Sequence, residues 1–111
     1  MDKKKYWDDR DADIGRYHLV VNGKEIGELK DVERVYRDSP DYVKRRYKGG
    51  RYLLDICIYG SSYNELLKAD NITEAKAEFE RWLADYYNGR IAGCKMAIKH
   101  YKEQLEYLKE D

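Results

Sequence analysis

Cysteine and long apolar runs are scarce in this sequence, and each scarcity excludes a class of protein. The 111 residues include two cysteines, too few for a disulfide-rich secreted scaffold. No stretch approaches the roughly 18 consecutive apolar residues of a membrane-spanning helix. No apolar segment follows the basic start, as it would in a signal peptide. The sequence therefore predicts a cytoplasmic protein that is not embedded in a membrane.

A net charge of one sign is also absent, although 40% of the residues are charged. The 22 basic and 22 acidic residues cancel, so the chain lacks the basic excess that is typical of nucleic-acid-binding domains. Twelve tyrosines and two tryptophans add apolar area to a chain with few large aliphatic residues. At this length we expect a thin, aromatic-rich core.

Motifs for catalysis and metal binding are missing as well. Histidine and cysteine are zinc ligands, but His18, Cys57, Cys94 and His100 include no closely spaced ligand pair. The acidic residues near the start match only the first three positions of a calcium loop. Phosphate-binding, metalloprotease and hydrolase motifs do not occur. We expect a protein that is not an enzyme, without metal or cofactor, and with two free cysteines.

The stretch from Thr73 to Lys109 has the longest helical pattern. In its second half, apolar residues recur at alternating steps of three and four: Ile91, Cys94, Ile98, Tyr101, Leu105 and Leu108. A first apolar segment precedes Asn88-Gly89, a pair that can end a helix in the left-handed conformation. This pattern predicts a helical hairpin. Its predicted core residues are Phe79, Trp82, Ile98 and Leu105.

Strand signals precede this hairpin. Asn22-Gly23 lies between alternating segments and is typical of a type I′ β-hairpin, in which Leu19 would face Ile26. Residues 51–59 are apolar on both faces, which predicts a central strand, and residues 63–68 are either an edge strand or a helical turn. The predicted fold is α+β, a three- or four-stranded antiparallel sheet packed against a C-terminal helical hairpin, plus one short helix.

The segment from Asp31 to Gly50 allows two interpretations. Ser39 as a cap and Pro40 at the first helical position favour the short helix. In the alternative, Gly49-Gly50 forms the turn of a second β-hairpin.

The ends of the predicted domain differ in character. Residues 1–15 are mostly charged, which predicts a loosely ordered N-terminal arm. Trp7 either holds this arm against the body or stays exposed for a partner. Residues 16–111 then form a single α+β domain.

Two surfaces are candidates for binding. The first interleaves basic residues with tyrosines, and its candidate residues are Tyr42, Lys44, Arg45, Arg46, Tyr47, Lys48 and Arg51. On a helix, Lys44, Arg45 and Lys48 share a face suited to phosphate or to an acidic protein surface, and tyrosines can stack on bases. The alternative is an ordinary solvated face.

The second candidate surface is a stripe of Met96, His100 and Tyr107, roughly opposite the apolar seam of the last helix. Either another part of the chain or a partner covers it, and a second copy in a homodimer is one such partner.

Clustered tyrosine and arginine are typical of binding hot spots, so the sequence predicts a non-enzymatic protein-binding module. The alternative is a nucleic-acid-binding protein that uses the Lys44–Arg51 patch. Short, charged, tyrosine-rich and cysteine-poor, the chain is similar to small phage and mobile-element accessory proteins, including anti-CRISPR inhibitors of host defence nucleases. This resemblance lies in size and composition alone. It implies a stoichiometric inhibitor with a nuclease or nucleoprotein complex as partner.

Overall fold

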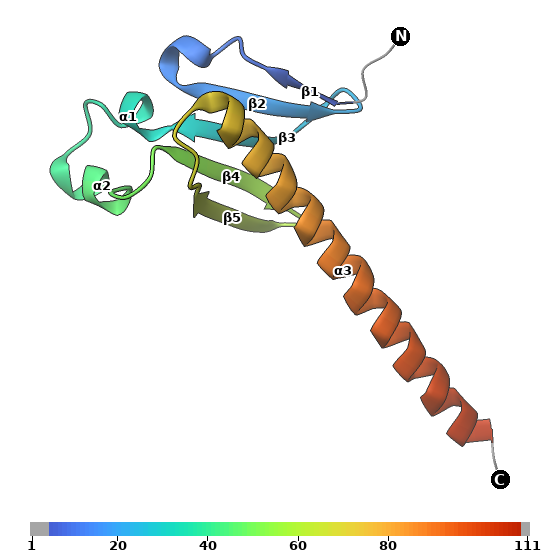
Figure 1. Cartoon of the computed structure of the whole chain (residues 1–111). Helices are drawn as coiled ribbons and strands as arrows, with labels where there is room; N and C mark the ends of the chain where they lie inside the picture. The colour runs from blue at the N-terminus through green and yellow to red at the C-terminus, as the bar shows by residue number, and fades with distance from the viewer. Residues whose placement is uncertain (1–4, 110–111) are drawn as a thin grey trace. The chain divides into compact units, whose positions relative to one another are not determined.

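The structure, a computed structural model, describes residues 5–109 and contains one sheet and one long helix (Figure 1). The strands are β1 (Lys5–Asp8), β2 (Arg16–Val21), β3 (Lys24–Asp31), β4 (Tyr52–Ile58) and β5 (Ser61–Leu66). The helices are the 3-10 turn η1 (Ala12–Ile14), α1 (Val32–Val35), α2 (Asp41–Arg46) and α3 (Ile72–Lys109). The described chain forms two compact units, one ending at Phe79 and one beginning at Glu80. Helix α3 contributes to both.

Each strand pairs antiparallel with the next one in the chain, so the sheet order is β1-β2-β3-β4-β5. The α+β class is confirmed, but the sheet has five strands within the described residues instead of three or four. Of residues 63–68, for which an edge strand or a helical turn was predicted, residues 63–66 lie in strand β5. β1 comes from the segment predicted to be an arm, of which residues 1–4 lie outside the described residues.

The turn between β2 and β3 follows the predicted Asn-Gly chemistry. Asn22 and Gly23 have φ values of 52° and 76°, the left-handed conformations that a type I′ turn requires. The predicted pairing of Leu19 with Ile26 is wrong, because a bulge shifts the register and places Gly27 opposite Leu19. The extra residue on β3 changes which side chains face the core.

The core of the first unit lies between the sheet and the first turns of α3. Phe79 is fully buried, as are Leu29 and Leu54 on the sheet. A Cβ atom on Gly27 would come within 2.7 Å of the Phe79 ring, so only glycine leaves room there. The Trp7 ring meets Phe79 edge-on at 5.3 Å between centroids, a favourable aromatic geometry. The predicted burial of Phe79 is confirmed, and Trp7 packs on the body.

Helix α3 begins where the sequence predicts. The Asn71 side chain accepts a hydrogen bond from the Glu74 backbone N–H at 2.9 Å, which satisfies one free donor of the first turn. Glu78 then accepts backbone N–H bonds from Lys68 and Ala69, each at 3.0 Å. These bonds fix the loop between β5 and α3.

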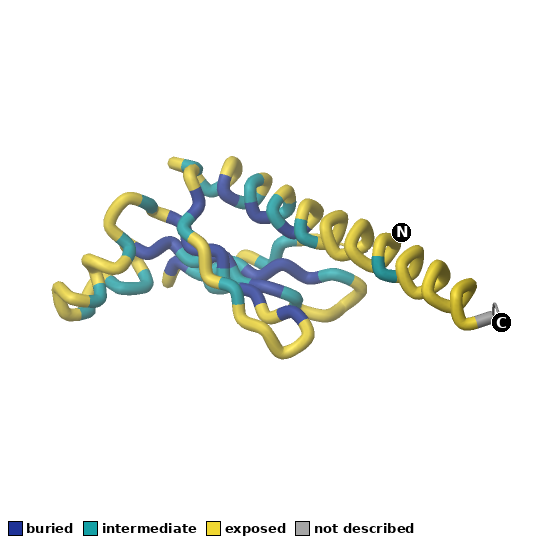
Figure 2. Tube along the Cα trace, turned by 90° about the horizontal axis from the view of Figure 1, so that it is seen from below, coloured by how far each residue is buried: buried dark blue, intermediate teal, exposed yellow. Residues whose placement is uncertain are grey.

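The predicted helical hairpin is wrong, because α3 continues through Asn88-Gly89 to Lys109. Gly89 does not adopt a positive φ, and glycine inside a helix costs only about 1 kcal/mol. Ile98 and Leu105, which a hairpin would bury, are 52% and 53% exposed. Figure 2 shows burial in the sheet and the first turns of α3, while the later turns are mostly exposed. Among residues 5–109, no helix is both long and apolar enough to cross a membrane.

The short helix is confirmed as α2, and the second hairpin does not form. Pro40 occupies the cap position instead of the first helical position, and its fixed φ suits a helix entry. Gly49 follows the helix with a φ of 110°, a conformation that favours glycine.

Phe79→Ala should lower the free energy of unfolding by about 3–5 kcal/mol, because it leaves a cavity beneath Gly27 and Trp7. Leu105→Ala, in the same helix but exposed, should change it by less than about 0.5 kcal/mol. Urea unfolding followed by circular dichroism measures both. Equal losses in the two variants would contradict this placement of the core.

Candidate functional site

The apolar residues predicted to line the hairpin are instead exposed on α3. We call this set the α3 seam: Ile91, Cys94, Ile98, Tyr101, Leu105 and Leu108. The five large side chains among them are 52–79% exposed, and Cys94 is an exposed free cysteine. All six lie in the second unit, beyond Glu80.

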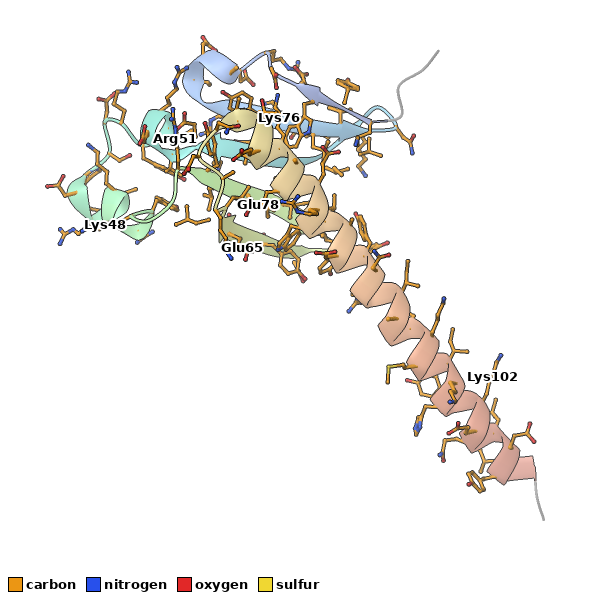
Figure 3. The ribbon with its side chains drawn as sticks, viewed as in Figure 1. Lys48, Arg51, Glu65, Lys76, Glu78 and Lys102 are labelled. Atoms are coloured by element: carbon orange, nitrogen blue, oxygen red, sulfur yellow. The ribbon has the colours of Figure 1, made fainter. Side chains whose placement is uncertain are left out.

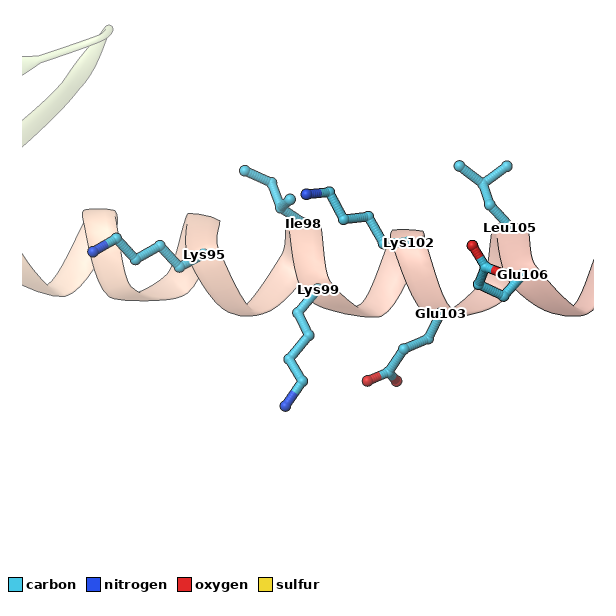
Figure 4. A pocket seen from close by; sticks show the side chains of 7 residues that line it. All are labelled: Lys95, Ile98, Lys99, Lys102, Glu103, Leu105 and Glu106. Carbon is cyan, nitrogen blue, oxygen red and sulfur yellow. The ribbon is translucent and has the colours of Figure 1, made fainter.

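Spacing makes the α3 seam a single stripe. Ile91, Ile98 and Leu105 are seven residues apart, and Cys94, Tyr101 and Leu108 repeat with the same spacing. This is the a and d pattern of a helix that packs along a second helix. Figure 4 shows Ile98, Lys102 and Leu105 directed to one side of α3 and Lys99 and Glu103 directed to the other. These residues line a shallow hollow on the helix surface.

The basic surface lies on α2 and the residues that follow it. Lys44, Arg45 and Lys48 line one shallow hollow together with Asp41, so the predicted common face exists. Tyr42 and Arg46 are exposed beside them. Asp41 adds a carboxylate to this hollow, which weakens its attraction for phosphate.

Two predicted residues of this surface, Tyr47 and Arg51, are engaged within the fold, and Figure 3 labels Arg51. The Tyr47 ring stacks on Tyr36 at 4.7 Å, and its hydroxyl donates to the Tyr36 hydroxyl at 3.5 Å. The Arg51 guanidinium donates to the buried Asp31 carboxylate at 3.2 Å and lies 3.7 Å from Glu33. These contacts raise the pKa of Arg51, with the Asp31 hydrogen bond as the main cause.

The Met96, His100 and Tyr107 stripe is exposed. Met96 and Tyr107 are 74% and 71% exposed, and His100 is exposed between them. The described chain therefore does not bury this stripe, and its cover by a partner stays a prediction.

A polar cluster around His18 was not predicted from the sequence. His18 on β2 is buried, with Nε2 hydrogen-bonded to the Asp11 carboxylate at 2.8 Å. Its Nδ1 lies 2.6 Å from a Glu25 carboxylate oxygen without hydrogen-bond alignment. Asp11 precedes β2 in the sequence and Glu25 follows it, so no short sequence motif indicated that they meet at His18. The cluster ties the η1 loop to the β2–β3 hairpin.

Comparisons with protein-family models, with curated proteins and with solved structures found no match for this chain. The surfaces described above are therefore the basis for proposing a function. The α3 seam exposes five large apolar side chains, and the basic surface exposes one, Tyr42.

Tyrosine ionisation tests the stacked Tyr36–Tyr47 pair. Burial, and next the Tyr47 hydroxyl, raise the pKa of Tyr36 from 10.0 to about 12. Because the folded-state pKa is raised, the stabilisation is fully present below about pH 10 and is lost as pH rises towards 12.

In an ultraviolet titration, Tyr36→Phe should remove part of the late phenolate signal. Tyr52, whose pKa burial also raises, should supply another part. Tyr59→Phe, at a 97% exposed position, should leave the late signal in place. An unchanged late signal in Tyr36→Phe would contradict the pairing.

Proposed function

We propose that this chain is a non-enzymatic protein-binding module and that the α3 seam is its docking surface. The observation that supports this function is the exposure of six seam residues at coiled-coil spacing. A contiguous apolar stripe on a helix surface is typical of an interaction site. Amphipathic helices commonly bind a partner through residues at these intervals.

The energetics favour a partner. Burying one Ile or Leu side chain gains about 1.5–3 kcal/mol, and the α3 seam exposes Ile91, Ile98, Leu105 and Leu108. A helix that stays exposed forgoes this gain and has only local hydrogen bonds to stabilise it. A second helix along the α3 seam would supply the missing burial.

The α3 seam is not needed for the core of the sheet. That core closes on Phe79 and Ala75, both fully buried in the first unit. Beyond Glu80, Leu83 is also buried, whereas the large side chains of the α3 seam are exposed. Substitutions in the α3 seam should affect association far more than folding.

The proposal extends to stoichiometric inhibition of a host nuclease, the role that the resemblance to phage accessory proteins implies. Such an inhibitor acts by occupying a surface of its target. It needs a docking element and no catalytic group, which fits an exposed helix.

Nucleic-acid binding is the second candidate function. Its support is the common hollow of Lys44, Arg45 and Lys48. Its weakness is that Asp41 shares the hollow and that Arg51 is paired with Asp31. This surface therefore offers nucleic acid fewer cations and fewer tyrosine rings than the sequence suggests.

A photo-crosslinking amino acid in place of Ile98 should give a discrete adduct with one protein in the cells that make this chain. The same amino acid in place of Met96, on the other side of α3, is the matched control. The Ile98 adduct should disappear when Leu105→Glu is added, because a charge in the stripe prevents close packing. Equal labelling from both positions, or labelling that persists with Leu105→Glu, would contradict the docking surface.

A gel shift with duplex DNA at two salt concentrations tests the second candidate. If the α2 surface binds phosphate, replacing Lys44, Arg45 and Lys48 by Ala should flatten the salt dependence of binding, because each lost contact removes counterion release. We expect the wild type to bind DNA weakly and the triple variant to differ little from it. Tight, salt-sensitive binding lost in the triple variant would reverse the order of the two functions.

A further inference from the structure

We propose that the occupant of the α3 seam is a helix of a different protein whose apolar stripe is flanked by acidic residues. This inference rests on the proposed function and adds the chemistry of the partner. A second copy of this chain and a neutral helix are the competing occupants. Charge along the edges of the α3 seam decides among them.

In a two-stranded coiled coil, the residues that flank the stripe, at positions e and g, reach the partner helix. On one side of the α3 seam these are Lys95 and Lys102, which directly follow Cys94 and Tyr101. On the other side they are Arg90, Ala97 and Gln104, which directly precede the three a positions. All five are basic or uncharged.

Acidic residues occur on the same stretch of helix but not at positions e and g. Asp85 and Glu106 lie at position b, and Glu103 lies at position f on the outer side of the helix. Glu106 lines the same hollow as Lys102 and Leu105. Figure 4 shows Glu103 directed away from Ile98 and Leu105. The charged residues at positions e and g are therefore all basic, although the stretch contains charges of both signs.

Self-association would bring like charges together. In a parallel pair, position g of one helix faces position e of the other, so Arg90 would meet Lys95 of a second copy. In an antiparallel pair, e faces e, so lysines would meet lysines. Like charges across an interface are unfavourable, and neither arrangement offers an acidic residue in compensation.

Side-chain size points the same way. A parallel pair of identical helices would place Tyr101 beside Tyr101 in one layer and Cys94 beside Cys94 in another. Such layers are alternately overfilled and underfilled, and both faults reduce packing energy. A different helix can set a small residue opposite Tyr101 and a large one opposite Cys94. Acidic residues on its flanks would then meet Lys95, Lys102 and Arg90.

The test uses the full chain and three labelled synthetic helical peptides. The first has an apolar a/d stripe flanked by Glu, the second has the same stripe flanked by Lys, and the third keeps Glu but has Ser in the stripe. Fluorescence anisotropy should show the Glu-flanked peptide binding at least about tenfold more tightly than either other peptide. Its affinity should fall as salt is raised.

Substitutions in the chain separate the charge from the stripe. Lys95→Glu with Lys102→Glu should reverse the preference toward the Lys-flanked peptide. Leu105→Glu should weaken binding of the Glu-flanked peptide about tenfold or more, whereas Met96→Glu, on the other side of α3, should leave it within about twofold. Circular dichroism on each variant confirms that the helix is retained.

Failures of this inference and of the proposed function look different. Equal affinity for the Glu- and Lys-flanked peptides, with loss in Leu105→Glu, would overturn the acidic partner and retain the docking surface. Binding of no peptide, or binding that Leu105→Glu does not change, would overturn both. A dimer of the chain alone in light scattering, dissociated by Leu105→Glu, would show that the occupant is a second copy.

Discussion

The approach of the Phe79 ring to the backbone of Gly27 is the contact on which the first unit depends. A side chain at position 27 would collide with the ring, and the bulge in the β2–β3 hairpin is what brings Gly27 opposite Leu19. Trp7 closes on the edge of the same ring. One aromatic side chain thus joins the start of α3 to two strands that are distant from it in sequence.

On α3 the large buried apolar side chains end at Leu83, and the α3 seam beyond it is exposed. In the proposed function, fold stability and binding depend on different stretches of one helix. The first turns are held by buried contacts and by the Glu78 bonds to the preceding loop. The α3 seam has the spacing of a packed helix and the exposure of a surface. In the proposed function, this division allows the residues of the α3 seam to vary without loss of the sheet.

A net charge of zero conceals a local separation of charge. Beside the α3 seam the charged residues at positions e and g are basic, and Glu103 lies on the outer side. On α2 the cations share a hollow with Asp41, and Arg51 is held by Asp31. The proposed recognition therefore depends on which edge of a helix presents a charge, since long-range attraction by a molecule without net charge is weak.

The sequence by itself determined the elements whose causes are local. The Asn22-Gly23 turn, the apolar strand β4, the helix α2 and the Asn71 cap all follow from neighbouring residues. The sequence also placed the residues of the α3 seam on one face. Only the tertiary structure decided that β1 joins the sheet, that Tyr47 and Arg51 are engaged, and that α3 does not turn back at Gly89. Helical spacing shows that a face is apolar but not what covers it, because the covering partner is distant in the chain or belongs to another molecule.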